Sequence, residues 1–422
     1  MTRPTGRGFR PGPSGAGVAV PRRWLAVLGG ATLVVLLMAW WLKSNCLAQP
    51  WGDGFEYRHF CYSDIQVQYV FRVNSGHDVP VPYSGLLGEP GFNEYPALTG
   101  LTMYLAAVLT DNIGAYMGVQ AVLLGVLALA TTAVLARLAP PKQVLWWAAA
   151  PGLFLYAFYS WDLLAVGFCV LGILAYRRER FLLSGALLGL GAAAKLYPAF
   201  LMPALGLALV ARAGGRLDRS GWAFGGGFVA AWLAVNLPFM LAYFPGWWET
   251  YAWQMGRGPN LESPYFVLGH LGRHNGLGVF EPMGDEAAAS VVAMLLFLGS
   301  LVVSGHLAAT RRLEPLAAAA IPVFAFLAFN KVQSIQYVLW ALPLLALLPL
   351  RDGQRAAVVA ADVALFLALF TFFAVSPQVA DTALYLPVGV AVIARCGAYT
   401  WILSGLVQKG YAHRPRNLAK AA

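Results

Sequence analysis

The chain is a series of apolar segments separated by short polar ones. A helix needs roughly 17 to 25 apolar residues to cross a bilayer, and no polar stretch between Trp24 and Leu406 is long enough for a soluble domain. The pattern therefore predicts one membrane domain over residues 24–408. Its twelve predicted spans are 24–42, 114–137, 143–159, 162–176, 181–194, 198–212, 222–244, 288–309, 315–329, 335–350, 355–375 and 381–396.

A thirteenth apolar window, at 97–110, is shorter and directly follows Pro96. The tails decide how to interpret it, because both the N-terminal tail (1–23) and the C-terminal tail (409–422) are basic. The positive-inside rule then places both ends in the cytoplasm, which requires an even number of crossings. The window 97–110 is therefore predicted to be an interfacial helix on the outer face.

Composition supports this assignment. The chain is 59% hydrophobic and only 11% charged, which is too apolar for an ordinary soluble domain. The predicted class is an all-α polytopic protein of the cytoplasmic membrane, with a disordered cytoplasmic tail over 1–23. The net charge of +10 falls mostly on the predicted inner loops and tails. The positive charge is therefore explained by the membrane topology, and no nucleic-acid partner is predicted.

Two predicted outer segments, 43–113 and 245–287, are much longer than the other connections, and long loops commonly carry function. The first segment contains Cys46 and Cys61. In the oxidising space outside the membrane these cysteines are expected to form a disulfide, although two free thiols are the alternative.

Directly after Cys61, the residues Ser63 to Gln66 (SDIQ) fit a capping box. Ser63 is then the N-cap of a helix and Gln66 reaches back to it, which places Asp64 in the first turn. Two roles for Asp64 follow from this pattern. It complements the helix dipole, or it acts as a general base. The pattern leaves both open.

Other polar side chains lie at the predicted outer ends of spans or in the outer segments. Cations at span ends commonly extend to the interface without any function. An acid at the hydrocarbon edge, in contrast, needs a partner or a cavity, and the closely spaced polar residues 330–337 indicate a polar pocket. The candidates for substrate binding are Glu94, Tyr95, Asp162, Lys195, Arg257, Lys331, Gln333, Gln336 and Tyr337.

Several well-known sequence motifs of catalytic and binding sites are absent. The sequence has no Walker loop, no HExxH and no CxxC pair, so nucleotide, zinc and redox sites are not predicted. No cofactor and no metal-ligating residue are implied, and the need for a divalent metal stays open. A twelve-helix secondary transporter is a competing interpretation, but no internal repeat supports it.

The order of these elements resembles a known family. A first span, an outer aspartate that opens a helix, Tyr95-Pro96, the WD turn at 161–162, KLYP at 195–198 and NKxxSxQYxLW at 330–340 resemble the GT-C glycosyltransferases. The likeness is closest to glycosyltransferase family 87, over about residues 24–350. The family often has YPP where this chain has Tyr95-Pro96-Ala97, which leaves the subfamily undecided.

The resemblance implies a GT-C-like bundle that transfers a sugar from a polyprenyl phosphate, usually with inversion, at the outer face of the membrane. Actinobacterial members include mannosyltransferases that use polyprenyl-phosphate mannose. The implied partners are therefore this donor, a lipid or glycan acceptor of the cell envelope, and membrane lipids. A polyprenyl-phosphate-arabinofuranose donor is the alternative within this class.

The resemblance maps the family's catalytic aspartate onto Asp64, which would accept the proton of the acceptor hydroxyl. A cation must stabilise the departing phosphate. Among the predicted outer cations, Lys331 is the first candidate for this role, followed by Arg257 and then Lys195. Sugar orientation is assigned to Asp162, Glu94, Gln333 and Tyr337.

Overall fold

The computed structural model describes residues 21–49, 54–70, 93–274, 277–375 and 382–412. Within these ranges every regular element is a helix, which confirms the predicted all-α class. The helices are α1 (Arg22–Ser44), α2 (Phe55–Arg58), α3 (Asp64–Gln68), α4 (Ala97–Val108), α5 (Ile113–Leu138), α6 (Pro141–Ala148), α7 (Pro151–Tyr156), α8 (Asp162–Arg177), α9 (Phe181–Ala194), η2 (Tyr197–Leu201), α10 (Met202–Arg212), α11 (Arg219–Gly256), α12 (Pro264–His274), η3 (Gly278–Gly284), α13 (Glu286–Ala309), α14 (Pro315–Phe329), η4 (Ile335–Tyr337), α15 (Val338–Leu347), α16 (Asp352–Val375) and α17 (Thr382–Ala412).

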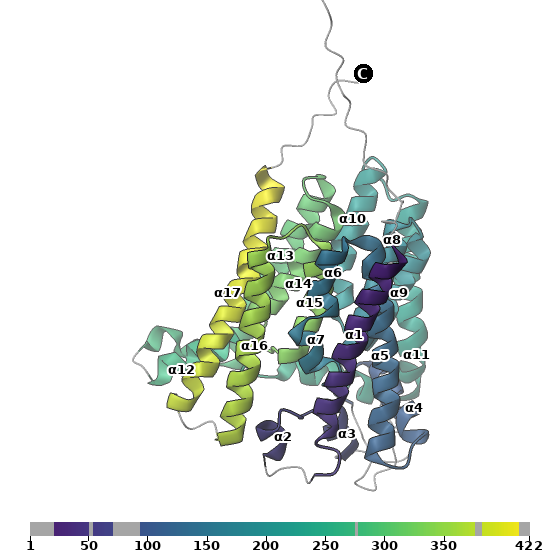
Figure 1. Cartoon of the computed structure of the whole chain (residues 1–422). Coiled ribbons are helices and arrows are strands. Elements are labelled where there is room, and N and C mark those ends of the chain that lie inside the picture. Colours follow the sequence, from purple (N-terminus) through teal and green to yellow (C-terminus); the bar gives the residue numbers. More distant parts are fainter. Residues whose placement is uncertain (1–20, 50–53, 71–92, 275–276, 376–381, 413–422) are drawn as a thin grey trace, which may run out of the picture.

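Most helices run side by side in one bundle (Figure 1). In the described part of the chain, six of them are long and apolar enough to cross a membrane, namely α1, α5, α11, α13, α16 and α17. The other predicted spans coincide with shorter or divided helices. Window 143–159 is divided between α6 and α7, and α7 has a proline in its first turn. Proline is tolerated there but ends a preceding helix.

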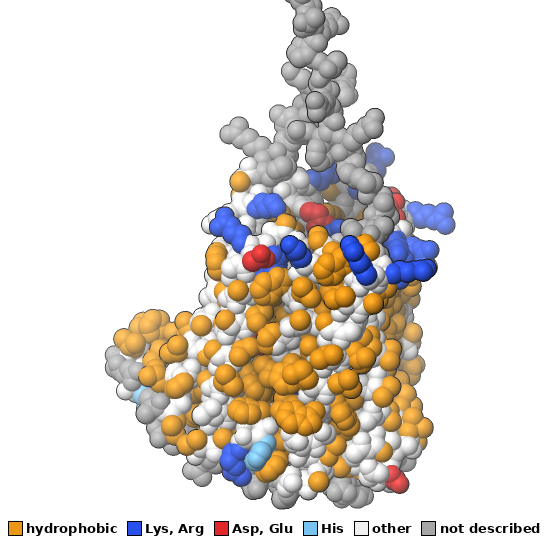
Figure 2. Space-filling view, in the orientation of Figure 1, with side chains coloured by type: hydrophobic (Ala, Val, Ile, Leu, Met, Phe, Trp, Pro, Cys, Tyr) orange, Lys and Arg blue, Asp and Glu red, His pale blue; other side chains and the backbone are white. Residues whose placement is uncertain are grey.

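Charge is distributed unevenly along the bundle. Lys and Arg side chains gather at its upper end in Figure 2, where α1 begins and α17 ends (Figure 1). The short helices α2 and α3 lie at the opposite end. Both ends of the membrane domain thus share one end of the bundle, as an even number of crossings requires. That the basic end faces the cytoplasm stays a prediction from the positive-inside rule.

Several helices extend beyond the predicted boundaries. Helix α1 begins at Arg22, and α17 continues to Ala412, beyond the predicted limit at 408. Residues 1–20 and 413–422 of the predicted tails lie outside the described residues. The predicted outer loop 245–287 is largely helical, because α11 bends at Tyr243, continues to Gly256 and is followed by α12 and η3. A hydropathy window detects only the apolar part of a helix. It does not detect a polar continuation of the same helix beyond that part.

Close approach of α9 and α11 depends on glycine. A Cβ atom at Gly185 would collide with the carbonyl group of Phe224, and one at Gly189 with that of Phe228. Small residues at this spacing allow two helix backbones to touch in a membrane bundle. The contact holds α9 in position, and Lys195 follows directly after its last residue.

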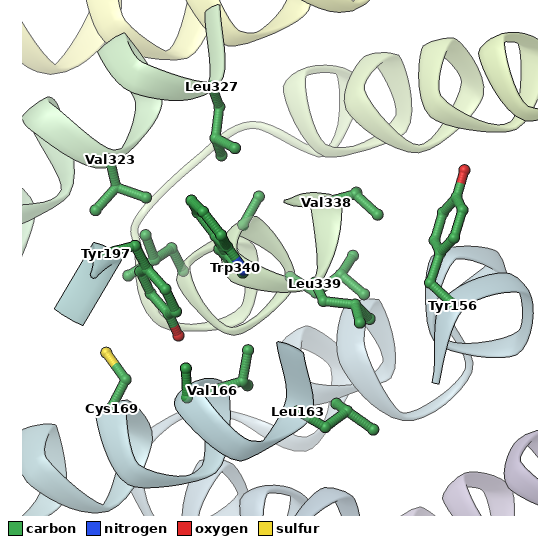
Figure 3. Close-up of a cluster of buried hydrophobic side chains, with 14 of the residues drawn as sticks. Tyr156, Leu163, Val166, Cys169, Tyr197, Val323, Leu327, Val338, Leu339 and Trp340 are labelled. Atoms are coloured by element: carbon green, nitrogen blue, oxygen red, sulfur yellow. The ribbon is translucent and has the colours of Figure 1, made fainter. Parts of the chain in front are cut away.

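The buried core includes a cluster of aromatic and aliphatic side chains (Figure 3). The rings of Tyr197 and Trp340 stack with centroids 4.5 Å apart, and Leu163 and Val166 of α8 lie beside them. Helices α14 and α15 are buried on nearly every side, as expected of helices that are apolar all round. This close packing supports the polar residues that lie next to it.

Candidate active site

Helix α3 begins at Asp64, as the sequence predicted, but the predicted capping box is wrong. Ser63 has the extended backbone of an N-cap and makes no capping bond. Its hydroxyl donates instead to the carbonyl oxygen of Phe158, at 2.7 Å. The Gln66 amide donates to the carbonyl oxygen of Lys43, at 2.8 Å. Both side chains therefore join α3 to neighbouring elements, because buried polar groups take the acceptors that packing brings closest.

Two further links hold the first outer segment. Cys46 and Cys61 form a disulfide, with their Cα atoms 5.7 Å apart. The fully buried Lys43 donates from Nζ to the carbonyl oxygens of Phe60, at 3.2 Å, and Tyr62, at 2.8 Å. These contacts lie immediately before Asp64 and fix the backbone that presents it.

Asp64 is half-buried, and its carboxylate has partners from distant segments. Its Oδ2 atom accepts hydrogen bonds from the Tyr95 hydroxyl, at 3.1 Å, and from the Gln336 amide, at 3.4 Å. The backbone N–H of Asp64 donates to the carbonyl oxygen of Tyr159, at 2.8 Å. Three of the predicted site residues, Asp64, Tyr95 and Gln336, are therefore in direct contact.

Burial raises the pKa of Asp64 to about 6, and the negative charge of Glu94 adds to this effect. The positive charge of Lys195 and hydrogen bonds from Tyr95 and Tyr62 act in the opposite direction and lower the pKa. An ordinary aspartate has a pKa of about 3.9. A base works best when its pKa lies near the working pH, so this environment suits proton abstraction.

Asp162 and Lys195 form an ion pair beside Asp64. Asp162 is fully buried at the start of α8, and its carboxylate accepts hydrogen bonds from Lys195 Nζ, at 2.9 Å, and Trp340 Nε1, at 2.6 Å. The Lys195 ammonium also faces the rings of Tyr95, at 5.8 Å, Tyr337, at 5.0 Å, and Trp340, at 5.9 Å. Tyr95 thus contacts both Asp64 and the Lys195 side chain.

Glu94 lies at the edge of the same cluster. Its carboxylate accepts a hydrogen bond from the Gln68 amide, and its backbone carbonyl accepts one from the Gln254 amide, at 3.1 Å. The residue therefore links α3 to the outer part of α11.

The other two candidate cations contact different groups. The buried Lys331 donates from Nζ to the carbonyl oxygen of Met255, at 2.7 Å, and to the hydroxyl of Ser290, at 2.6 Å. Arg257 lies over the ring of Trp253, 4.7 Å from its centroid. Of these three cations, Lys195, ranked third from the sequence, is the one that pairs with an acid of the cluster.

Sequence reasoning missed a second polar group, which includes the predicted residue Gln333. The side chain of Gln333 accepts a hydrogen bond from Arg395, at 2.9 Å, and Arg395 also donates to the carbonyl oxygen of Glu262, at 3.2 Å. Burial raises the pKa of Glu262 to about 7. One feature of the sequence could have revealed this group. Ionisable residues within apolar helices are commonly functional, and Arg395 in α17 and Asp362 in α16 are two such residues.

In the described ranges, no three His, Cys, Asp or Glu side chains gather closely enough to hold a metal ion. The cluster of Asp64, Tyr95, Asp162, Lys195 and Gln336 can accept a proton at one carboxylate and present a positive charge nearby. This combination suits the transfer of a group from a phosphate leaving group to a hydroxyl.

The fold and the cluster define a multi-pass helical membrane protein with a carboxylate and lysine site at one end. The sequence model of glycosyltransferase family 87 matches residues 92–330, more than half of the chain. The chain belongs to this family and is a glycosyltransferase. No curated protein matches it. It is similar to the structure titled ArnT from Cupriavidus metallidurans bound to undecaprenyl phosphate, with 17% identity, a TM-score of 0.45, and coverage of 93% of this chain and 78% of that one.

Proposed function

We propose that this glycosyltransferase transfers mannose from polyprenyl-phosphate mannose to a hydroxyl group of a lipid or glycan acceptor at the outer face of the cytoplasmic membrane. The observation that carries the proposal is the half-buried Asp64, whose carboxylate is held by Tyr95 and Gln336 beside the Asp162–Lys195 pair. A donor anchored in the bilayer by its prenyl chain needs no nucleotide-binding motif, and the sequence contains none.

Asp64 is the proposed base. The acceptor oxygen attacks the anomeric carbon as its proton passes to the Asp64 carboxylate. The bond between the anomeric carbon and the phosphate oxygen breaks, and its electron pair leaves with polyprenyl phosphate. Attack opposite the leaving group inverts the configuration. A positioned base typically contributes a hundred- to ten-thousand-fold in rate.

Lys195 is the proposed cation for the departing phosphate. Its ammonium has one acidic partner, Asp162, and three aromatic rings around it. These contacts fix its position, and a fixed charge needs no reorganisation as negative charge develops on the leaving oxygen. The side chain is 16% exposed, so a phosphate oxygen can approach it from the open side.

The rings and amides around the two carboxylates would orient the sugar. Tyr337 is partly exposed and faces Lys195, and Gln336 already donates to Asp64. Glu94 supplies a further hydrogen-bond acceptor at the edge of the cluster. An aromatic face together with carboxylate and amide groups matches the alternating apolar and hydroxyl surfaces of a hexose.

The test uses membranes that contain the full-length protein and labelled polyprenyl-phosphate mannose. Lipid and glycan fractions are then analysed for label, with Asp64→Asn membranes as the matched control. We expect wild-type membranes to transfer mannose and the control to lose this activity. A parallel reaction with polyprenyl-phosphate arabinofuranose tests the sugar, since transfer of arabinofuranose alone would contradict the assignment to mannose.

A further inference from the structure

A cavity of about 410 Å³ lies at the basic end of the bundle, far along the helices from Asp64. Its walls come from the start of α14, the connection between α15 and α16, and the last turns of α17. The lining combines apolar side chains such as Trp401 and Leu350 with the polar groups of Arg351, Gln354 and Lys409. No part of the proposed transfer reaction uses it.

The cavity carries uncompensated positive charge. None of the described residues that line it is acidic, and the two acids nearest along the chain already have arginine partners. Asp352 pairs with Arg355 at 2.7 Å, and Glu314 pairs with Arg177 at 3.2 Å. Within the described ranges, Arg351 and Lys409 therefore keep their charges without an acidic partner.

An apolar surface leads away from this cavity along α17. The exposed side chains of Leu386, Val390, Ile393 and Trp401 recur every three, four or eight residues and so share one helix face. Trp401 lies at the end of this face and also lines the cavity, with 45% of its surface exposed. Tryptophan commonly occupies the level of the lipid headgroups.

We propose that the cavity binds the headgroup of an anionic phospholipid. The phosphate lies between Arg351 and Lys409, and an acyl chain follows the exposed face of α17. Basic pockets between membrane helices recognise such headgroups by charge. Free phosphate shares the headgroup chemistry but gains nothing from the apolar face, so the continuity of cavity and face favours the lipid.

The experiment measures lipid binding to the purified full-length protein in a neutral detergent by native mass spectrometry. Phosphatidylglycerol is the anionic probe and phosphatidylcholine the neutral one. We expect phosphatidylglycerol to bind wild type in preference to phosphatidylcholine. The double variant Arg351→Gln/Lys409→Gln should bind phosphatidylglycerol about 30-fold more weakly, since two cations near the headgroup are lost.

The matched control is Arg178→Gln/Arg180→Gln. It removes the same charge from exposed residues between α8 and α9, outside the cavity lining. This variant should retain wild-type affinity. Equal loss of binding in both double variants would overturn the proposal, because the attraction would then come from the general charge of this end.

A second variant tests the cavity without changing its charge. A Cβ atom at Gly405 would lie 3.3 Å from Nε2 of Gln354, so Gly405→Leu fills the space and keeps both cations. We expect it to lose binding while melting near the wild-type temperature in lipid-free detergent. Full binding by a folded Gly405→Leu protein would contradict the proposal. Displacement of the lipid by inorganic phosphate as readily as by phosphatidylglycerol would also contradict it.

Discussion

Two acids of this chain, Asp64 and Asp362, lie in very different surroundings. Asp64 is half-buried at the start of α3 and accepts hydrogen bonds from Tyr95 and Gln336. Asp362 lies within α16, is 1% exposed, and neither of its carboxylate oxygens has a hydrogen-bond partner in the described part of the chain. Both acids are costly in a membrane protein, but of the two only Asp64 is partly exposed.

The difference shows that an acid in an apolar chain is insufficient evidence of catalysis. An ionisable residue inside a membrane protein is commonly functional, and by that rule alone Asp362 would rank with Asp64. Access and partners separate the two. The cluster around Asp64 combines residues from five separate segments, whereas Asp362 lies inside the single long helix α16.

The largest expected effect is that of Asp64→Asn. The amide keeps the shape of the side chain but cannot accept a proton, so transfer should fall by roughly two to four orders of magnitude. Initial rates at saturating donor measure this loss, and donor binding should stay near wild type. A well-folded variant that transfers sugar at close to the normal rate would place the base elsewhere, with Glu94 and Asp162 the next acids to test.

The second largest effect is expected for Lys195→Gln. Loss of one fixed charge on the leaving group typically costs about a hundredfold in turnover, and Lys195→Arg should restore part of it. Lys331→Gln is the matched control, because this lysine hydrogen-bonds to Met255 and Ser290 instead. The folded Lys331→Gln protein should turn over near the wild-type rate. The reverse result would return Lys331 to first place among the cations.

A smaller effect is expected from pH. Burial raises the pKa of Asp64 to about 6, and the base is active only when deprotonated. Transfer should therefore be constant well above pH 6 and fall about tenfold for each pH unit below it. An ordinary aspartate would keep its activity down to about pH 4. The residual activity of Asp64→Asn should lack this decline, and a decline that persists would assign it to another group.

The smallest effect on transfer is expected for Asp362→Asn. The substitution replaces a buried carboxyl group whose oxygens have no hydrogen-bond partner in the described ranges, and the shape of the side chain hardly changes. The rate at saturating substrates should stay close to wild type, even if the melting temperature shifts. A loss as large as that of Asp64→Asn would show that Asp362 takes part in the reaction.

Much of the fold follows from local patterns. Each of the twelve predicted spans coincides with a helix or with two consecutive helices, because hydropathy over a window reports the solvent that a segment prefers. The start of a helix at Asp64 and the pairing of Cys46 with Cys61 also involve residues close in sequence. Family membership was indicated by short motifs in a fixed order.

The tertiary structure decided which side chains meet. The pairing of Lys195 with Asp162 and of Gln336 with Asp64 joins residues that are far apart in sequence, and no periodicity records such contacts. It also redirected Ser63 and Gln66 from the expected capping box to carbonyl groups of other elements. Sequence alone determines which segments enter the membrane, because that preference is local. Their packing determines which charges become neighbours, because ion pairs and hydrogen bonds depend on distances that only the folded bundle sets.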